Sequence, residues 1–148
     1  LRAAIDPLAP DLVVLAGFMR VLGAGLVEHY RGRLLNIHPS LLPAYRGLDT
    51  HARVLAAGER WHGASVHFVT PELDGGPVIA QARVPVRADD TPDSLAARVL
   101  VREHRLYPRV IAWFCSGRIG LSGDRVLFDG RPLTAPLQLE EPDACSAG

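Results

Sequence analysis

The pattern of apolar and polar positions along the chain predicts strands that alternate with helices. Continuous apolar runs at residues 11–17 and 33–37 are typical of strands buried on both faces of a sheet. Alternation at 64–70 and an apolar run at 77–86 predict two adjacent strands joined by a turn-rich segment. Apolar residues at helical spacing predict three helices, at 23–32, 49–58 and 91–117.

The longest helical pattern, at 91–117, carries signals at its start and an interruption inside it. Thr91 is expected at the N-cap with Pro92 in the first turn, and Pro108 should kink or break the helix. Its expected apolar positions are Leu95, Val99, Val101, Leu106, Val110 and Phe114. A short strand with an Asp-Gly turn is expected at 125–133.

This alternation predicts an α/β fold with a mainly parallel sheet and flanking helices. We expect one domain at 1–133 and a disordered tail at 134–148, which is rich in Pro, Glu and small residues. In such sheets the ligand crevice lies beyond the carboxyl ends of the strands. Three expected strand ends are polar or glycine-rich: Ala-Gly-Phe-Met-Arg, Asn-Ile-His-Pro and Glu-Leu-Asp-Gly-Gly.

Composition narrows the classes of function. The 148 residues are 48% hydrophobic, which favours a globular domain, and sixteen basic residues balance sixteen acidic ones. A balanced charge gives no footprint for general nucleic-acid binding, and no apolar run approaches the length of a membrane span. The two cysteines have no metal-ligand spacing and indicate a reduced, cytoplasmic compartment.

Candidate chemistry gathers at the predicted strand ends. Asn36 offers an amide N–H to a developing oxyanion, and His38 can donate a hydrogen bond or move a proton. Each also has a plain structural interpretation, Asn36 as a turn residue and His38 as a solvated loop histidine. Asp74 is either part of an Asp-Gly turn or the partner of His38, in which case its charge would raise the imidazole pKa. No pattern favours a metal site.

A specific family resemblance rests on two long motifs. They are Asn-Ile-His-Pro-Ser-Leu-Leu-Pro-Ala-Tyr-Arg-Gly and His-Gly-Ala-Ser-Val-His-Phe-Val-Thr-Pro-Glu-Leu-Asp-Gly-Gly-Pro-Val-Ile. They resemble the phosphoribosylglycinamide formyltransferase family over residues 11–133, and they stand in the order that the family shows. The resemblance implies a Rossmann-like formyltransferase fold. It also implies transfer of the formyl group of 10-formyltetrahydrofolate to the amine of glycinamide ribonucleotide in purine (IMP) synthesis.

The same resemblance implies roles for single residues. His38 takes the position of the catalytic histidine, Asn36 that of the amide that polarises the formyl oxygen, and Asp74 that of the aspartate that raises the histidine pKa. Glu103 takes the position of a glutamate that contacts the ribonucleotide sugar. The implied folate-binding residues are Met19, Arg20, Val21, Leu22, Asn36, Val69, Thr70 and Asp74.

The family's first strands and their phosphate-binding loop have no counterpart in this sequence. We therefore expect the chain to be the C-terminal two-thirds of such an enzyme, and poor turnover by this part alone. Two alternatives stay open: a 10-formyltetrahydrofolate hydrolase, which usually has a second histidine where Pro39 stands, and an inactive folate-binding fragment. A monomer or homodimer, with small-molecule substrates and neither nucleic acid nor membrane as a partner, is expected.

Overall fold

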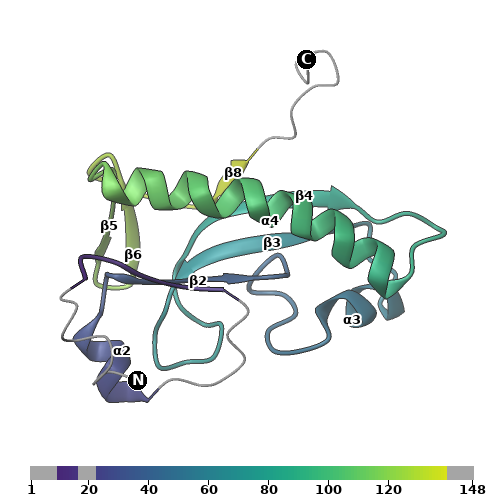
Figure 1. The fold of residues 1–148 in the computed structure, drawn as a ribbon, viewed down its shortest axis with the longest axis horizontal. Coiled ribbons are helices and arrows are strands. Elements are labelled where there is room, and N and C mark those ends of the chain that lie inside the picture. The colour runs from purple at the N-terminus through teal and green to yellow at the C-terminus, as the bar shows by residue number, and fades with distance from the viewer. Residues whose placement is uncertain (1–9, 17–22, 140–148) are drawn as a thin grey trace, which may run out of the picture.

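The computed structural model describes residues 10–16 and 23–139 (Figure 1). Within these residues the main sheet has five strands in the order β1-β2-β3-β4-β8. They are β1 (Val13–Leu15), β2 (Leu34–His38), β3 (Trp61–Phe68), β4 (Val78–Pro85) and β8 (Leu137–Leu139). The sheet is mixed: β1–β2 and β4–β8 are parallel pairs, whereas β2–β3 and β3–β4 are antiparallel. The predicted α/β class with flanking helices is confirmed.

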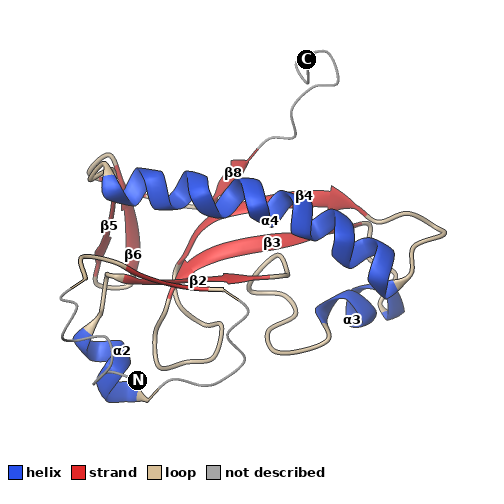
Figure 2. Ribbon diagram, in the orientation of Figure 1, coloured by secondary structure: helices blue, strands red, loops and turns tan. Residues whose placement is uncertain are grey.

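Helices cover both faces of this sheet. α4 (Pro92–Cys115) lies along one face and packs on β3 and β4, and α2 (Ala24–His29) lies on the other side of β2 (Figure 2). The alternation of β2 explains this division, because successive side chains of a strand point to opposite faces. Leu35 and Ile37 join the core beneath α4, whereas Leu34 joins a separate cluster with Val27 of α2. α3 (Thr50–Ala56) packs beside α4.

The start of α4 matches the prediction. Thr91 is the N-cap with Pro92 following it, and a capping box is closed by Ser94, whose N–H donates to the Thr91 hydroxyl while the Thr91 N–H donates to the Ser94 hydroxyl. The helix continues through Pro108 to Cys115, so the proline does not break it. Proline removes one helix hydrogen bond, but the fully buried Leu106 and Val110 on either side hold this turn on the sheet.

The buried stripe of α4 differs from the predicted one at two positions, Phe114, which is only partly buried against the core, and Val101. Val101 is 57% exposed, and the neighbouring Arg102 takes its place facing the interior, with 4% exposure. The buried stripe therefore consists of Leu95, Val99, Arg102, Leu106 and Val110. Arg102 is the only charged residue among these buried positions of α4.

The chain after α4 is more ordered than predicted. Three short strands, β5 (Ile119–Ser122), β6 (Arg125–Phe128) and β7 (Arg131–Pro132), form a second antiparallel sheet. The predicted Asp-Gly turn at Asp129 is confirmed, but β5 is not anticipated by the pattern. Within the segment expected to be disordered from residue 134, the structure has β8, which pairs in parallel with the edge of β4. Residues 140–148 of the expected tail lie outside the described residues.

Candidate active site

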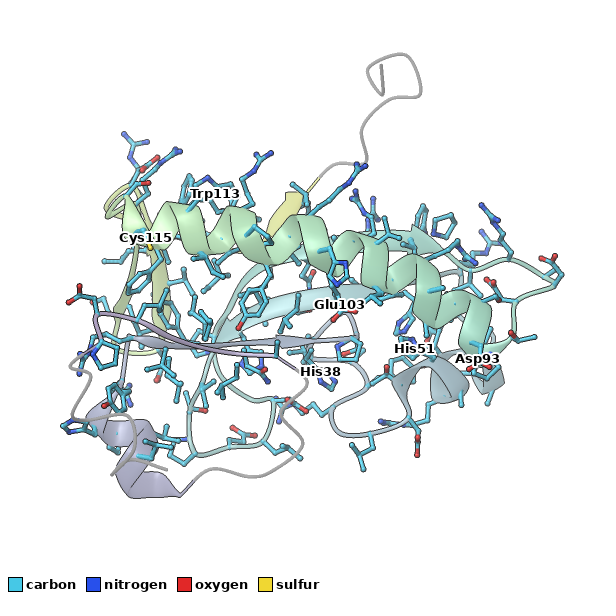
Figure 3. The ribbon with its side chains drawn as sticks, in the orientation of Figure 1. His38, His51, Asp93, Glu103, Trp113 and Cys115 are labelled. Atoms are coloured by element: carbon cyan, nitrogen blue, oxygen red, sulfur yellow. The ribbon has the colours of Figure 1, made fainter. Side chains whose placement is uncertain are left out.

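The end of β2 places Asn36 and His38 on one face of the sheet. They share this face with Leu34 because strand side chains alternate, and the intervening Leu35 and Ile37 hold the opposite face in the core. His38 is 6% exposed. The interpretation of His38 as a solvated loop residue is therefore wrong. Figure 3 shows it at the end of β2, close to the loop that leads to α3.

Both ring nitrogens of His38 face oxygen atoms. Nε2 lies 2.8 Å from the carbonyl oxygen of Tyr45, and because a carbonyl only accepts, Nε2 is the donor. Nδ1 lies 3.5 Å from Oδ2 of Asp74. The structure therefore contains the contact between His38 and Asp74 that the sequence could only suggest.

Asp74 lies in the β3–β4 connection with its side chain buried and hydrogen-bonded. Its side chain is 8% exposed, its backbone is left-handed with φ of 49°, and its Oδ2 accepts a hydrogen bond of 2.9 Å from the N–H of Gly47. Gly76, two residues on, is packed so closely that a Cβ there would lie 1.8 Å from the carbonyl oxygen of Phe68. This close approach, which only glycine allows, fixes the turn that presents Asp74 to His38.

His67 is a site residue that sequence reasoning placed on its strand without a role. It is the cross-strand partner of Asn36 and is fully buried. Its Nδ1 donates to the carbonyl oxygen of Phe68 at 3.0 Å, so Nε2 carries a lone pair and lies 3.9 Å from Oδ1 of Asp74. Burial lowers the pKa of His67, although the Phe68 carbonyl and the Asp74 charge oppose that shift.

Two buried polar atoms on this face have no hydrogen-bond partner among the described residues. They are Oδ1 of Asn36 and Nε2 of His67. Buried acceptors are almost always satisfied in folded proteins. Their position on adjacent strands, next to Asp74, identifies a place where the N–H groups of a small molecule or water would be accommodated.

A polar network on the same face anchors the loop that follows His38. The Ser65 hydroxyl donates to the carbonyl oxygen of Ser40 at 2.7 Å and accepts from the N–H of Leu42 at 3.0 Å. The Gln81 amide donates to the Leu42 carbonyl oxygen at 2.9 Å. Because Ser65 lies opposite His38 in the register, β3 holds both the strand end and its loop in place.

A pair of histidines supports α3, which follows this loop. Nδ1 of His51 lies 2.9 Å from Nε2 of His62, and the rings meet edge to face. The structure buries His62 completely. Burial, and next the charges of His51 and His38, lower the pKa of His62 to about 4, and burial also lowers the pKa of His51.

The remaining predicted site residues lie around this centre. Val69 donates its N–H to the Leu34 carbonyl oxygen at 2.9 Å and packs against the Val27 cluster, whereas Thr70 lines a cavity of about 510 Å³. Glu103 is half-buried on α4, its pKa is raised by burial, and no described contact joins it to His38 or Asp74. The predicted folate-binding residues Met19, Arg20, Val21 and Leu22 lie outside the described residues.

Two further properties concern the described residues only. In these residues no cluster of three or more histidine, cysteine or acidic side chains has the geometry to hold a metal ion. None of the helices within the described ranges combines the length and apolarity needed to cross a membrane.

Comparison with known proteins shows which family the chain belongs to. A family model described as formyl transferase matches residues 1–111. The chain belongs to the formyl transferase family. The resemblance drawn from the two motifs is thereby confirmed, and so is the formyltransferase fold.

The chain covers only part of the length of each protein that it matches here. The chain is 59% identical over 129 residues to the phosphoribosylglycinamide formyltransferase of Escherichia coli K12, a match of 87% of this chain and 61% of that protein. A phosphoribosylglycinamide formyltransferase structure from Coxiella burnetii superposes with a TM-score of 0.90 at 51% identity, covering 94% of this chain and 66% of the other. A formyltetrahydrofolate deformylase from Pseudomonas syringae superposes with a TM-score of 0.79 at 28% identity, covering 85% of this chain and 44% of the other.

Proposed function

We propose that the protein acts as a phosphoribosylglycinamide formyltransferase, which moves the formyl group of 10-formyltetrahydrofolate to the amine of glycinamide ribonucleotide in purine biosynthesis. The observation that carries the proposal is the buried contact between His38 and Asp74 beside Asn36 at one end of β2. Relatives from Escherichia coli and Haemophilus influenzae that bear this enzyme's name, at 59% and 44% identity, support it.

The reaction needs donors for an oxyanion and a path for protons. The amine nitrogen bonds to the formyl carbon while the carbonyl electron pair moves to oxygen, and the tetrahedral intermediate then loses an amine proton. Its carbonyl re-forms as the bond to N10 of the folate breaks, and N10 takes up a proton. One oxyanion donor typically lowers such a barrier by about 2.7–4 kcal/mol.

The residues at the end of β2 suit these steps. In this proposal His38 Nε2 exchanges the Tyr45 carbonyl oxygen for the developing oxyanion, and the Asn36 amide donates from the neighbouring position. The carboxylate of Asp74 orients the imidazole and compensates its positive charge when it is protonated. The partnerless acceptors on Asn36 and His67 suit the N–H groups of the attacking amine.

Binding roles for the outer residues are part of the same proposal. The backbone groups of residues 19–22, together with Val69 and Thr70, would contact the folate, and Glu103 would contact the ribonucleotide sugar. Burial disfavours the charged form of the Glu103 carboxyl group and raises its pKa. The bound sugar would therefore have to supply this carboxyl group with a hydrogen-bond partner.

Formyl transfer by variants of the full-length protein tests the proposal. We expect Asp74→Asn and His38→Asn to lower kcat roughly 10²–10⁴-fold, the range typical of general acid–base groups. Folate affinity should change much less, because the proposed roles concern the reacting atoms. The matched control is Asp89→Asn, which makes the same chemical change at an exposed position. Equal losses of affinity and turnover would show that the two residues only maintain the structure.

The structural likeness to a deformylase supports a second candidate, hydrolysis of 10-formyltetrahydrofolate with water in place of the amine. Formate release without the ribonucleotide, at a rate equal to formyl transfer, would favour the hydrolase. Folate binding with neither reaction would identify an inactive binding protein.

A further inference from the structure

A buried arginine interrupts the apolar face of α4 beside β8, an edge strand of the described sheet. Arg102 occupies a position between Val99 and Leu106 in the buried stripe. One of its nitrogens, Nη2, donates to the carbonyl oxygen of Leu139 at 2.6 Å. The other two, Nε and Nη1, are buried and have no hydrogen-bond partner among the described residues.

A guanidinium carries five N–H donors and a charge that it keeps at any physiological pH. One backbone carbonyl satisfies a single donor and supplies no compensating charge. Buried charges in proteins are normally paired, and no carboxylate within the described residues forms an ion pair with Arg102. The Leu139 contact alone therefore leaves the side chain without the partner that its burial requires.

A cavity of about 560 Å³ adjoins this arginine, between α4 and the end of β8. Arg105 and Arg109 also line it, and these three arginines lie on one side of the helix at spacings of three and four residues. His104 and Leu139 contribute further, and no acidic residue is part of the lining. Like charges at this spacing repel one another on an isolated helix, so an anion between them would relieve a repulsion that nothing in the lining offsets.

We propose that this cavity, formed by Arg102, Arg105 and Arg109 beside the end of β8, binds a small oxyanion such as the phosphate group of a metabolite. Planar guanidinium groups donate in pairs to phosphate or carboxylate oxygens. The volume lies in the range of small-ligand sites. β8 and β1 are the two edge strands of the described sheet, and none of the residues that line the cavity belongs to the candidate active site.

The experiment measures binding of inorganic phosphate to the protein by calorimetry at low ionic strength. The variant Arg105→Gln/Arg109→Gln keeps the buried Arg102, and we expect it to bind phosphate at least tenfold more weakly. The matched control Arg125→Gln/Arg131→Gln removes the same charge from exposed positions on β6 and β7, and its affinity should stay within twofold. Amide chemical shifts on α4 and β8 should move on titration. Failure of phosphate to bind, or equal weakening in both double variants, would overturn the proposal.

A second variant separates a free ligand from the chain's own carboxylates. The sequence continues after Leu139 with Glu140 and Glu141, which carry the same oxyanion chemistry. Phosphate binding that appears only in Glu140→Gln/Glu141→Gln would overturn a free ligand as the occupant. Phosphate that binds at the candidate active site, by contrast, would be insensitive to the arginine variants, so this result is independent of the proposed formyl transfer.

Discussion

Acidification should destabilise the protein through the histidine pair that supports α3. His62 is fully buried, and its pKa in the folded state is lowered from 6.5 to about 4 by burial, His51 and His38. In the unfolded chain the ring returns to its ordinary pKa and binds a proton more readily. The folded state is therefore favoured fully above pH 6.5, and this contribution is lost progressively as the pH falls toward 4.

The size of the effect follows from the two pKa values. One unit of pKa corresponds to about 1.4 kcal/mol, so the full shift of His62 is worth roughly 3 kcal/mol. At pH 4.5 the folded ring is still mostly neutral while the unfolded ring is charged, and the loss amounts to roughly 2–3 kcal/mol. A domain whose total stability is about 5–15 kcal/mol would lose a large part of it.

Urea unfolding of the protein and of His62→Gln, at pH 7.5 and 4.5 and constant ionic strength, tests this. Glutamine keeps a side chain that can hydrogen-bond to His51 but does not titrate. The unmodified protein should lose roughly 2–3 kcal/mol more than the variant between the two pH values, whatever the variant costs at pH 7.5. The control His29→Gln, an exposed histidine of α2, should lose as much as the unmodified protein. A difference between protein and His62→Gln below about 0.5 kcal/mol would refute the reasoning.

Two further predictions concern the scaffold of the candidate site. Gly76→Ala should lower the free energy of unfolding by about 1–3 kcal/mol, because its Cβ would lie 1.8 Å from the Phe68 carbonyl oxygen. Gly120→Ala, with open space around it, should change stability by less than about 0.5 kcal/mol, and similar costs at both glycines in chemical unfolding would contradict the packing argument. Ser65→Ala should lower the free energy of unfolding by about 1–3 kcal/mol, because it leaves buried backbone groups in the loop after β2 without a hydrogen-bond partner. The exposed Ser116→Ala is its control, and a neutral Ser65→Ala would show that water replaces the hydroxyl.

The sequence predicted those parts of the site that depend on order along the chain. The end of β2 with Asn36 and His38, and the Asp-Gly-Gly turn at Asp74, are visible as local patterns. The contact between His38 and Asp74 remained a conjecture, because spacing along the chain does not fix which strands are neighbours. The motif resemblance, rather than the periodicity of apolar residues, predicted that His38 and Asp74 act together.

The residues that sequence reasoning missed depend on register between elements. His67 faces Asn36, and Ser65 faces His38, because β2 and β3 pair in one particular antiparallel register. Alternation along β3 shows that these side chains share a face but not which partner lies opposite. Arg102 was missed for a different reason: Val101 was preferred between Val99 and Leu106 because it is apolar, although steps of three and four residues along the helix give Arg102.

The geometry of the candidate site depends on the core that lies directly behind it. Leu35 and Ile37 alternate with Asn36 and His38 along β2, and they pack beneath α4 on the opposite face. A slip of β2 by one residue would turn the amide and the imidazole into that core and the apolar pair outward. Such an exchange would bury polar groups without partners, which is costly. The same burial of Leu35 and Ile37 that stabilises the sheet therefore fixes the direction in which Asn36 and His38 point.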